Sequence, residues 1–200
     1  MLKALTILAV FAFLLLPAGG QAGPPAPTYT VSDGPNDKLL VVAGDGNDDL
    51  GTFYGSETGP GRFQISPNDA TETIVETSEH CTPSVPFPDR IVYCDYGVSQ
   101  FNLNLGAGND KYFPFPETSD EPWPSGVKLV ENGGPGDDVL RGAEGDDAIK
   151  GSTGRDKLIG KDGSDKINAK DGEAERSINC GGGDDPAPKV DPEDPRPKHC

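Results

Sequence analysis

Residues 133–168 read GGPGDDVLR GAEGDDAIK GSTGRDKLI GKDGSDKIN, which are four consecutive nonapeptides without a gap. The first and fourth positions of every copy are glycine, the sixth is aspartate, and the eighth is leucine or isoleucine. A single Gly-Asp cluster would indicate an ordinary turn, but four copies in one register indicate a repeat architecture. The nine-residue period therefore decides the fold of this part of the chain.

Each repeated position has its own chemical role. Glycine permits backbone angles that other residues avoid, so several carbonyl groups of one turn can face a common point. The aspartate adds a negative charge to that turn, while the apolar eighth position lies in a short strand and points inward. The turn glycines are Gly133, Gly134, Gly136, Gly142, Gly145, Gly151, Gly154, Gly160 and Gly163, and the aspartates are Asp138, Asp147, Asp156 and Asp165.

These turns predict sites for calcium. Ca²⁺ takes six to eight oxygen ligands from carboxylates and backbone carbonyls, which are the groups that the turns supply. If two nonapeptides form one coil, turns of alternate copies lie side by side, which pairs Asp138 with Asp156 and Asp147 with Asp165. Each pair then closes on an ion between successive coils. The four copies make two complete sites and leave half-sites at the ends of the array.

The nonapeptides resemble the hemolysin-type calcium-binding repeat, also called the RTX repeat. The resemblance covers residues 133–168 and implies a right-handed parallel β-roll, a kind of β-solenoid, with Ca²⁺ at its turns. One departure from the family pattern is the second position, which is glycine only in the first copy. It is Ala143, Ser152 and Lys161 in the later copies, so we expect stiffer or weaker turns there.

The composition indicates that apolar packing alone does not order the chain. Of 200 residues, 34% are hydrophobic and 27 are glycine, and the formal net charge is −16. Low apolar content with high net charge is typical of disordered chains, and the charge argues against nucleic acid as a partner. Neighbouring carboxylates repel one another until a divalent ion lies between them. We therefore expect the repeats to be loose without calcium and to order when it binds.

Residues 1–22 have the features of a secretory signal peptide. Lys3 precedes an apolar run, and Gly20 and Ala22 are placed like the −3 and −1 residues of a cleavage site. The run is short for a membrane span, so we expect a secreted, extracellular protein without membrane insertion. Exported toxins and proteases with RTX repeats usually carry an uncleaved C-terminal signal instead. Their activities are therefore not carried over to this chain.

The sequence after the leader contains four cysteines, Cys81, Cys94, Cys180 and Cys200. An even number of cysteines in an exported chain favours disulfides. We expect two local bonds, the first between Cys81 and Cys94 and the second between Cys180 and Cys200, because each would close a short loop. A zinc site is the alternative, since a histidine precedes one cysteine of each pair, but the close ligand couples of zinc motifs are missing.

Strand signals dominate residues 28–130, and no useful helical period occurs. The β-prone runs, bounded by Gly, Pro or Asp, are 39–43, 62–65, 73–76, 90–94 and 100–105. We therefore expect an all-β chain in which an irregular β region precedes the repeats.

Two isolated turns in this region echo the repeat, at 44–48 and 106–110. Calcium sites or plain Asx turns would both explain them.

After residue 168 the nine-residue period decays. Ala174 occupies the place of the acid, with Glu175 one residue late, and residues 180–185 match the turn again. Terminal repeats are expected to be atypical. We therefore expect 131–185 to form the β-roll with a degenerate cap, and the proline-rich tail 186–200 to lie against its end.

Calcium binding without catalysis is the function that the sequence predicts. Neither His-Glu-x-x-His nor Gly-x-Ser-x-Gly occurs, although the 33 acidic residues leave a hydrolase with a carboxylate pair open. A second class is recognition or adhesion, because the loop 112–124 holds four aromatic residues that could bind a cell-surface, carbohydrate or protein ligand. The same residues could instead plug the junction with the repeats, which burial of Trp123 would indicate.

Overall fold

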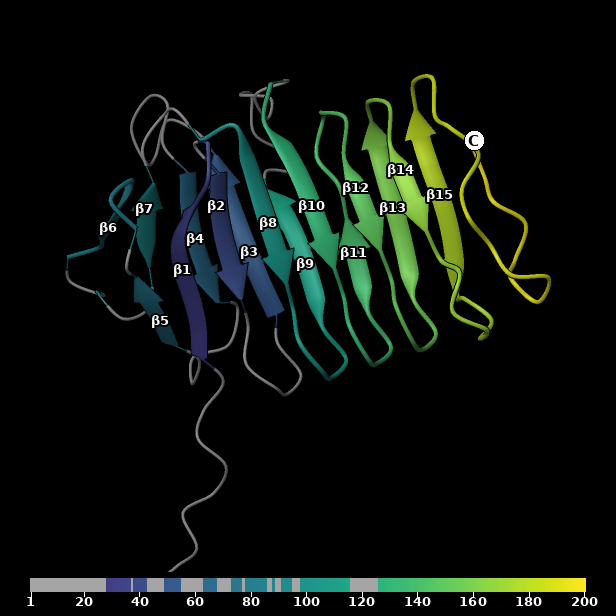
Figure 1. Cartoon of the computed structure of the whole chain (residues 1–200), viewed down its shortest axis with the longest axis horizontal. Helices are drawn as coiled ribbons and strands as arrows, with labels where there is room; N and C mark the ends of the chain where they lie inside the picture. The colour runs from purple at the N-terminus through teal and green to yellow at the C-terminus, as the bar shows by residue number, and fades with distance from the viewer. Residues whose placement is uncertain are drawn as a thin grey trace, which may run out of the picture.

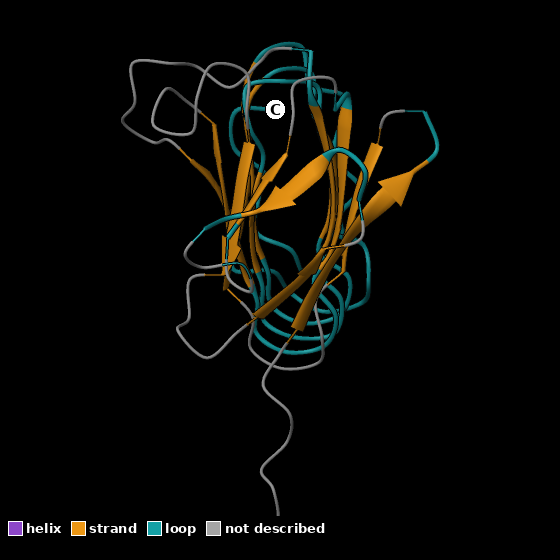
Figure 2. Ribbon diagram, turned by 90° about the vertical axis from the view of Figure 1, so that its left-hand side faces the viewer, coloured by secondary structure: helices purple, strands orange, loops and turns teal. Residues whose placement is uncertain are grey.

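The computed structural model describes residues 28–36, 38–42, 49–54, 63–67, 73–76, 78–85, 88, 91–94, 98–115 and 126–200. Within these ranges the chain is all-β, and no helix occurs. The strands form two sheets that face each other (Figure 1, Figure 2). The predicted all-β class is therefore confirmed.

One sheet contains seven strands in the order β14-β12-β10-β8-β2-β1-β5. Their bounds are β1 Thr28–Gly34, β2 Lys38–Val42, β5 Thr73–Glu76, β8 Gln100–Asn104, β10 Lys128–Asn132, β12 Ala148–Lys150 and β14 Lys166–Asn168. The other sheet contains eight strands in the order β15-β13-β11-β9-β3-β4-β7-β6. Their bounds are β3 Asp49–Tyr54, β4 Phe63–Pro67, β6 Cys81–Pro83, β7 Val92–Cys94, β9 Lys111–Phe115, β11 Val139–Arg141, β13 Lys157–Asp162 and β15 Ser177–Gly182.

From β8 onward the chain alternates between the two sheets, so that one strand of each sheet forms a coil. Strands of successive coils pair in parallel, with Leu140 opposite Leu158 and Ile149 opposite Ile167. The shift between these partners is two nonapeptides, which is the coil that the period predicts. The coils stack along the long axis of the molecule (Figure 1).

The parallel stacking also extends upstream of the repeats. β2 pairs with β8 and β3 with β9, and β8 pairs in turn with β10. Among the described strands, antiparallel pairing occurs only at the N-terminal end, between β1 and β2, β3 and β4, β4 and β7, and β6 and β7. Both sheets are therefore mixed at this end of the stack.

The core changes character along the stack. The eighth positions of the repeats, Leu140, Ile149, Leu158 and Ile167, are all at most 3% exposed. Large aromatic side chains are buried at the N-terminal end instead, where the rings of Phe63 and Phe101 meet edge to face with centroids 4.8 Å apart. Full burial of one Leu or Ile contributes roughly 2 kcal/mol. Among the described residues, the repeat half therefore has less apolar packing than the upstream half.

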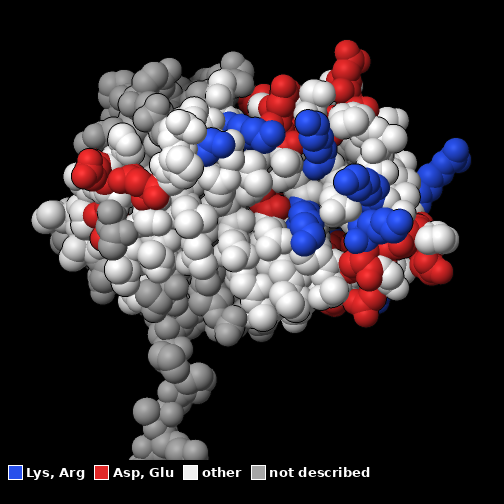
Figure 3. Space-filling model, in the orientation of Figure 1, with Lys and Arg blue, Asp and Glu red and all other residues white. Residues whose placement is uncertain are grey.

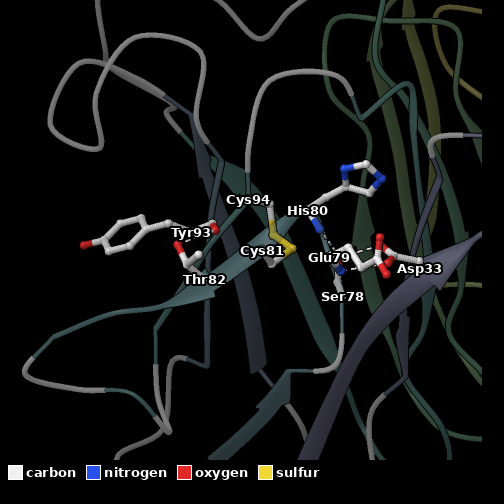
Figure 4. The surroundings of a disulfide bond; sticks show 8 residues. All are labelled: Asp33, Ser78, Glu79, His80, Cys81, Thr82, Tyr93 and Cys94. Carbon is white, nitrogen blue, oxygen red and sulfur yellow. Dashed lines mark hydrogen bonds between the residues drawn. A yellow bond between two sulfur atoms is a disulfide. The ribbon is translucent and has the colours of Figure 1, made fainter.

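The first disulfide, between Cys81 and Cys94, joins β6 to β7. The residues just before it tie this hairpin to β1, because Ser78 Oγ and the Glu79 amide both donate hydrogen bonds to the Asp33 carboxylate (Figure 4).

The second disulfide, between Cys180 and Cys200, joins β15 to the C-terminus. The proline-rich tail adds a parallel bridge to the last strand of each sheet, Lys189 opposite Asn168 and Lys198 opposite Asn179. The tail thus covers the end of the stack, as the sequence suggested. Both disulfides are the pairs that the sequence favoured, so no cysteine is available for the alternative zinc site.

Several sequence predictions concern residues that lie outside the described ranges. They are the leader 1–22, the turn 44–48 and the part of the aromatic loop that contains Trp123. A search of the described residues for a helix of sufficient length and apolarity to span a membrane found none.

Candidate calcium sites

The turns between strands lie along two edges of the stack. The first edge, at the bottom of Figure 1, contains the turns 106–110, 133–138 and 151–156, each leading from the seven-stranded to the eight-stranded sheet. The second edge, at the top, contains the turns 142–147 and 160–165, which lead back. In the repeat half, acidic side chains gather toward these edges, and Lys and Arg lie across the face between them (Figure 3).

The four repeat aspartates lie inside the turns and are at most 1% exposed. On the first edge, the Asp138 amide donates a hydrogen bond to Asp156 Oδ1 over 2.8 Å. On the second edge, the Asp147 amide donates to Asp165 Oδ1 over 2.9 Å. The structure therefore brings together the same pairs that the two-repeat coil predicts, each aspartate reaching back to the coil before its own.

The second oxygen of each aspartate points toward the first glycine of its own turn. A Cβ atom added to Gly133 would overlap Asp138 Oδ2 and would also lie within 3 Å of the Gly151 carbonyl oxygen of the next coil. A Cβ atom on Gly142 would meet Asp147 Oδ2 and the Gly160 carbonyl oxygen in the same way. A carboxylate oxygen and a carbonyl oxygen of successive coils thus converge where glycine leaves space.

Most of these second oxygens are without a hydrogen bond. Asp138 Oδ2, Asp156 Oδ2 and Asp165 Oδ2 are buried and have no donor among the residues that the structure describes. Asp147 Oδ2 accepts a hydrogen bond from the Ala143 amide over 2.7 Å. A buried polar atom without a partner is costly, so these oxygens fit a ligand that the protein itself does not provide.

Burial makes the charged form of these aspartates unfavourable. Desolvation raises the pKa of Asp138 and of Asp165 to about 7, against the lowering effect of the amide hydrogen bonds that they accept. It raises the pKa of Asp147 and of Asp156 to about 6. A divalent cation beside these carboxylates would favour their ionised form.

The glycine at the fourth repeat position allows successive turns to approach closely. Gly154 has φ +127°, and a Cβ atom there would overlap the Gly136 carbonyl oxygen of the preceding coil. At the second position the departures from glycine carry strain, because Ser152 and Lys161 have φ +80° and +78°. Ala143 is not among the residues with positive φ.

The donors fit calcium better than a metal that prefers nitrogen or sulfur. No group of three or more His, Cys, Asp or Glu side chains in the described ranges could hold a metal ion. Each turn instead brings one carboxylate together with backbone carbonyls. An all-oxygen set of this kind suits a hard cation with a high coordination number.

The comparison with protein families agrees with this geometry. Residues 132–167 match the family described as the RTX calcium-binding nonapeptide repeat, in four copies. This segment is an RTX repeat array. RTX nonapeptide repeats bind Ca²⁺, which is therefore the cofactor of the array. Comparison with curated proteins and with solved structures gave no match.

A buried glutamate beside the second edge of the RTX array was not predicted. Glu131 on β10 is 2% exposed, and in the sheet it lies opposite Leu103 on one side and Ile149 on the other. Burial, followed by the charges of Asp147 and Asp165, raises its pKa well above the ordinary value. Counting the nonapeptide register back from Gly133 places Glu131 at an eighth position, and this signal could have identified it.

The aromatic segment upstream of the array is only partly described. Tyr112 is fully buried, which fits a role in the junction. Phe113 is half-buried, and the Arg141 guanidinium lies over its ring at 5.4 Å from the centroid. These two residues therefore pack against the fold, while the exposure of Trp123 that would favour recognition lies outside the described residues.

Proposed function

We propose that this protein is a secreted, non-enzymatic calcium-binding protein whose RTX array forms a right-handed parallel β-roll. Ca²⁺ binds between stacked Gly/Asp turns and drives the folding of the array. The observation that carries this proposal is the pair of edges along which buried aspartates alternate with glycine carbonyls. Asp138 and Asp156 serve the first edge, and Asp147 and Asp165 serve the second, together with the carbonyls of the turn glycines.

The coupling of binding to folding follows from the weak apolar core of the array. Only one large apolar side chain per nonapeptide is buried, and several carboxylate oxygens are buried beside it without hydrogen bonds. In the absence of metal these oxygens oppose folding, and a divalent cation reverses their contribution. We place the calcium-dependent unit at 131–185, after the β region 28–130 and before the tail 186–200.

Secretion fits the two disulfides, which form and persist in oxidising compartments. The leader 1–22 supports the same destination. An extracellular site needs only modest affinity, so we expect dissociation constants of about 10⁻⁴ to 10⁻³ M.

Calorimetric titration of the protein without its leader tests this function. We expect heat of calcium binding and a gain of β signal in circular dichroism that chelation reverses. Mg²⁺ is the matched control, because it demands stricter octahedral geometry and shorter bonds than these turns favour. The proposal is wrong if Ca²⁺ does not bind, or if Mg²⁺ orders the chain equally well.

A further inference from the structure

We infer that the series of calcium sites continues beyond the four repeats at both ends, with Asp110, Glu175 and Asp185 each completing one additional site. This inference rests on the proposed function, because it assigns one ion to each gap between stacked turns. The nonapeptides alone provide two such gaps. The three additional carboxylates raise the number to five, three on the first edge and two on the second.

The upstream site lies between the turns 106–110 and 133–138. The isolated turn has the backbone of a repeat, since Gly106 and Gly108 have φ +86° and +147°, against +107° and +144° for Gly134 and Gly136. Its hydrogen bonds repeat as well, because the Gly108 amide donates to the Pro135 carbonyl over 2.9 Å, as the Gly136 amide does to Thr153 over 2.8 Å.

The acids of this upstream turn are also placed as in a repeat. Asp110 is fully buried, and its amide donates to Asp138 Oδ1 over 2.9 Å. Asn109 Oδ1 accepts a hydrogen bond from the Asp137 amide, 28 residues away. Within the array, Asp137 Oδ1 accepts a hydrogen bond from the Arg155 amide of the next coil in the same way. The contacts of 106–110 therefore favour a calcium turn over a plain Asx turn.

The downstream site on the second edge lies between the turns 160–165 and 181–185. The Asp165 amide donates to Asp185 Oδ1 over 2.8 Å, and the Gly163 amide donates to the Gly182 carbonyl over 2.9 Å. Asp165 Oδ2 is buried without a donor in the described part of the chain. A Cβ atom on Gly160 would meet both this oxygen and the Cys180 carbonyl oxygen. The same two kinds of oxygen converge here as within the array.

The downstream site on the first edge lies between the turns 151–156 and 169–175, and it depends on Glu175. Its Oε2 accepts a hydrogen bond from the Asp156 amide over 2.5 Å, which is the contact that Asp156 itself makes to Asp138. Glu175 stands one residue late in the sequence. Its side chain is longer than that of aspartate by one methylene, and this extra length returns the carboxylate to the row of stacked aspartate carboxylates. Glu175 is 4% exposed.

The remaining oxygens at this position point to a ligand. Glu175 Oε1 and Asp156 Oδ2 are both buried, and neither has a hydrogen-bond partner within the described ranges. Two carboxylates of successive coils thus each offer one free oxygen. Calcium, which binds carboxylates from more than one turn, satisfies both.

The test is a count of bound calcium on the full chain without its leader, by native mass spectrometry at saturating Ca²⁺. We expect five ions on the wild type, and one fewer on each of Asp110→Asn, Glu175→Gln and Asp185→Asn. The matched controls are Glu173→Gln and Asp184→Asn, which change exposed acids in the same two downstream turns. Both controls should keep all five ions.

The wild-type count needs no variant, so a variant that fails to fold does not prevent the test. A count above two that falls by one in the site variants and not in the controls supports the additional sites. Two ions on the wild type, or a count that all three site variants leave unchanged, overturns them while leaving the proposed function intact. A wild type that binds no calcium contradicts the proposed function itself.

Discussion

Replacing Glu131 by leucine should stabilise the calcium-loaded protein. Glu131 occupies an inward position between Leu103 and Ile149, and both of its carboxylate oxygens are buried without a hydrogen bond in the described structure. Relieving a buried unsatisfied polar group is worth about 1–3 kcal/mol. Burying a leucine in the same row adds up to roughly 2 kcal/mol, reduced by imperfect packing. We therefore expect a net gain of about 2–4 kcal/mol.

The expected gain in stability follows from the direction of the pKa shift of Glu131. The pKa of Glu131 is raised in the folded state, so this group destabilises the fold at every pH above its unfolded pKa of about 4.3. The gain from the leucine should therefore grow as the pH rises above about 4.3, and it should be larger at pH 7.5 than at pH 4. The Glu131→Gln variant is the control, because it removes the charge but keeps a polar group that needs partners, and it should gain less.

Urea unfolding in saturating Ca²⁺ measures the free energy of unfolding of the wild type and both variants. If Glu131→Leu is less stable than the wild type, the carboxylate has a favourable partner in solution. The reasoning about an unsatisfied buried glutamate would then be refuted.

Three other perturbations give separate checks. Lys161→Gly should raise the free energy of unfolding by about 1 kcal/mol, because it removes the strain of a left-handed backbone conformation. Ala143→Gly is the control and should not raise it. Equal effects of the two substitutions in urea unfolding would contradict the strain at Lys161. Calcium affinity should fall as the pH drops from 8 to 5, because Asp138 and Asp165 have folded pKa values of about 7 and bind protons in competition with the ion. The stability of the metal-free chain should change in the other direction and fall as the pH rises over the same range. Calorimetry measures the first dependence, and unfolding at several pH values measures the second. Replacing Asp147 and Asp165 together by asparagine should remove binding at the second edge and leave the first edge loaded, and mass spectrometry that finds both edges empty would show that the edges are not independent.

The parts of the fold that follow from the nine-residue period could be predicted from the sequence. The two-repeat coil, the inward Leu140 and the pairing of Asp138 with Asp156 all depend on chemistry that recurs at fixed spacing. The upstream coils could not be predicted in the same way, because long connections separate β2, β8 and β10 and remove the period. Their parallel pairing becomes visible only when the strands are placed side by side.

The missing parts of the candidate site have a similar cause. The sequence register places Glu175 one residue late. Only the hydrogen bond from the Asp156 amide shows that its carboxylate occupies the position of a repeat aspartate. Glu131 was missed because an acid at an inward position contradicts the pattern of the other eighth positions. In both cases the packing of side chains, rather than the order of residue types, decides the outcome.

The central claim is that calcium between turns, rather than apolar packing, holds the repeat coils together. Hydrogen exchange of the amides of Asp138 and Asp147, which donate hydrogen bonds between successive coils, tests it most directly. We predict strong protection of these amides in Ca²⁺ and rapid exchange after chelation, while amides of the upstream coils at β2 and β8 stay protected. Equal protection of Asp138 and Asp147 with and without calcium would contradict the account.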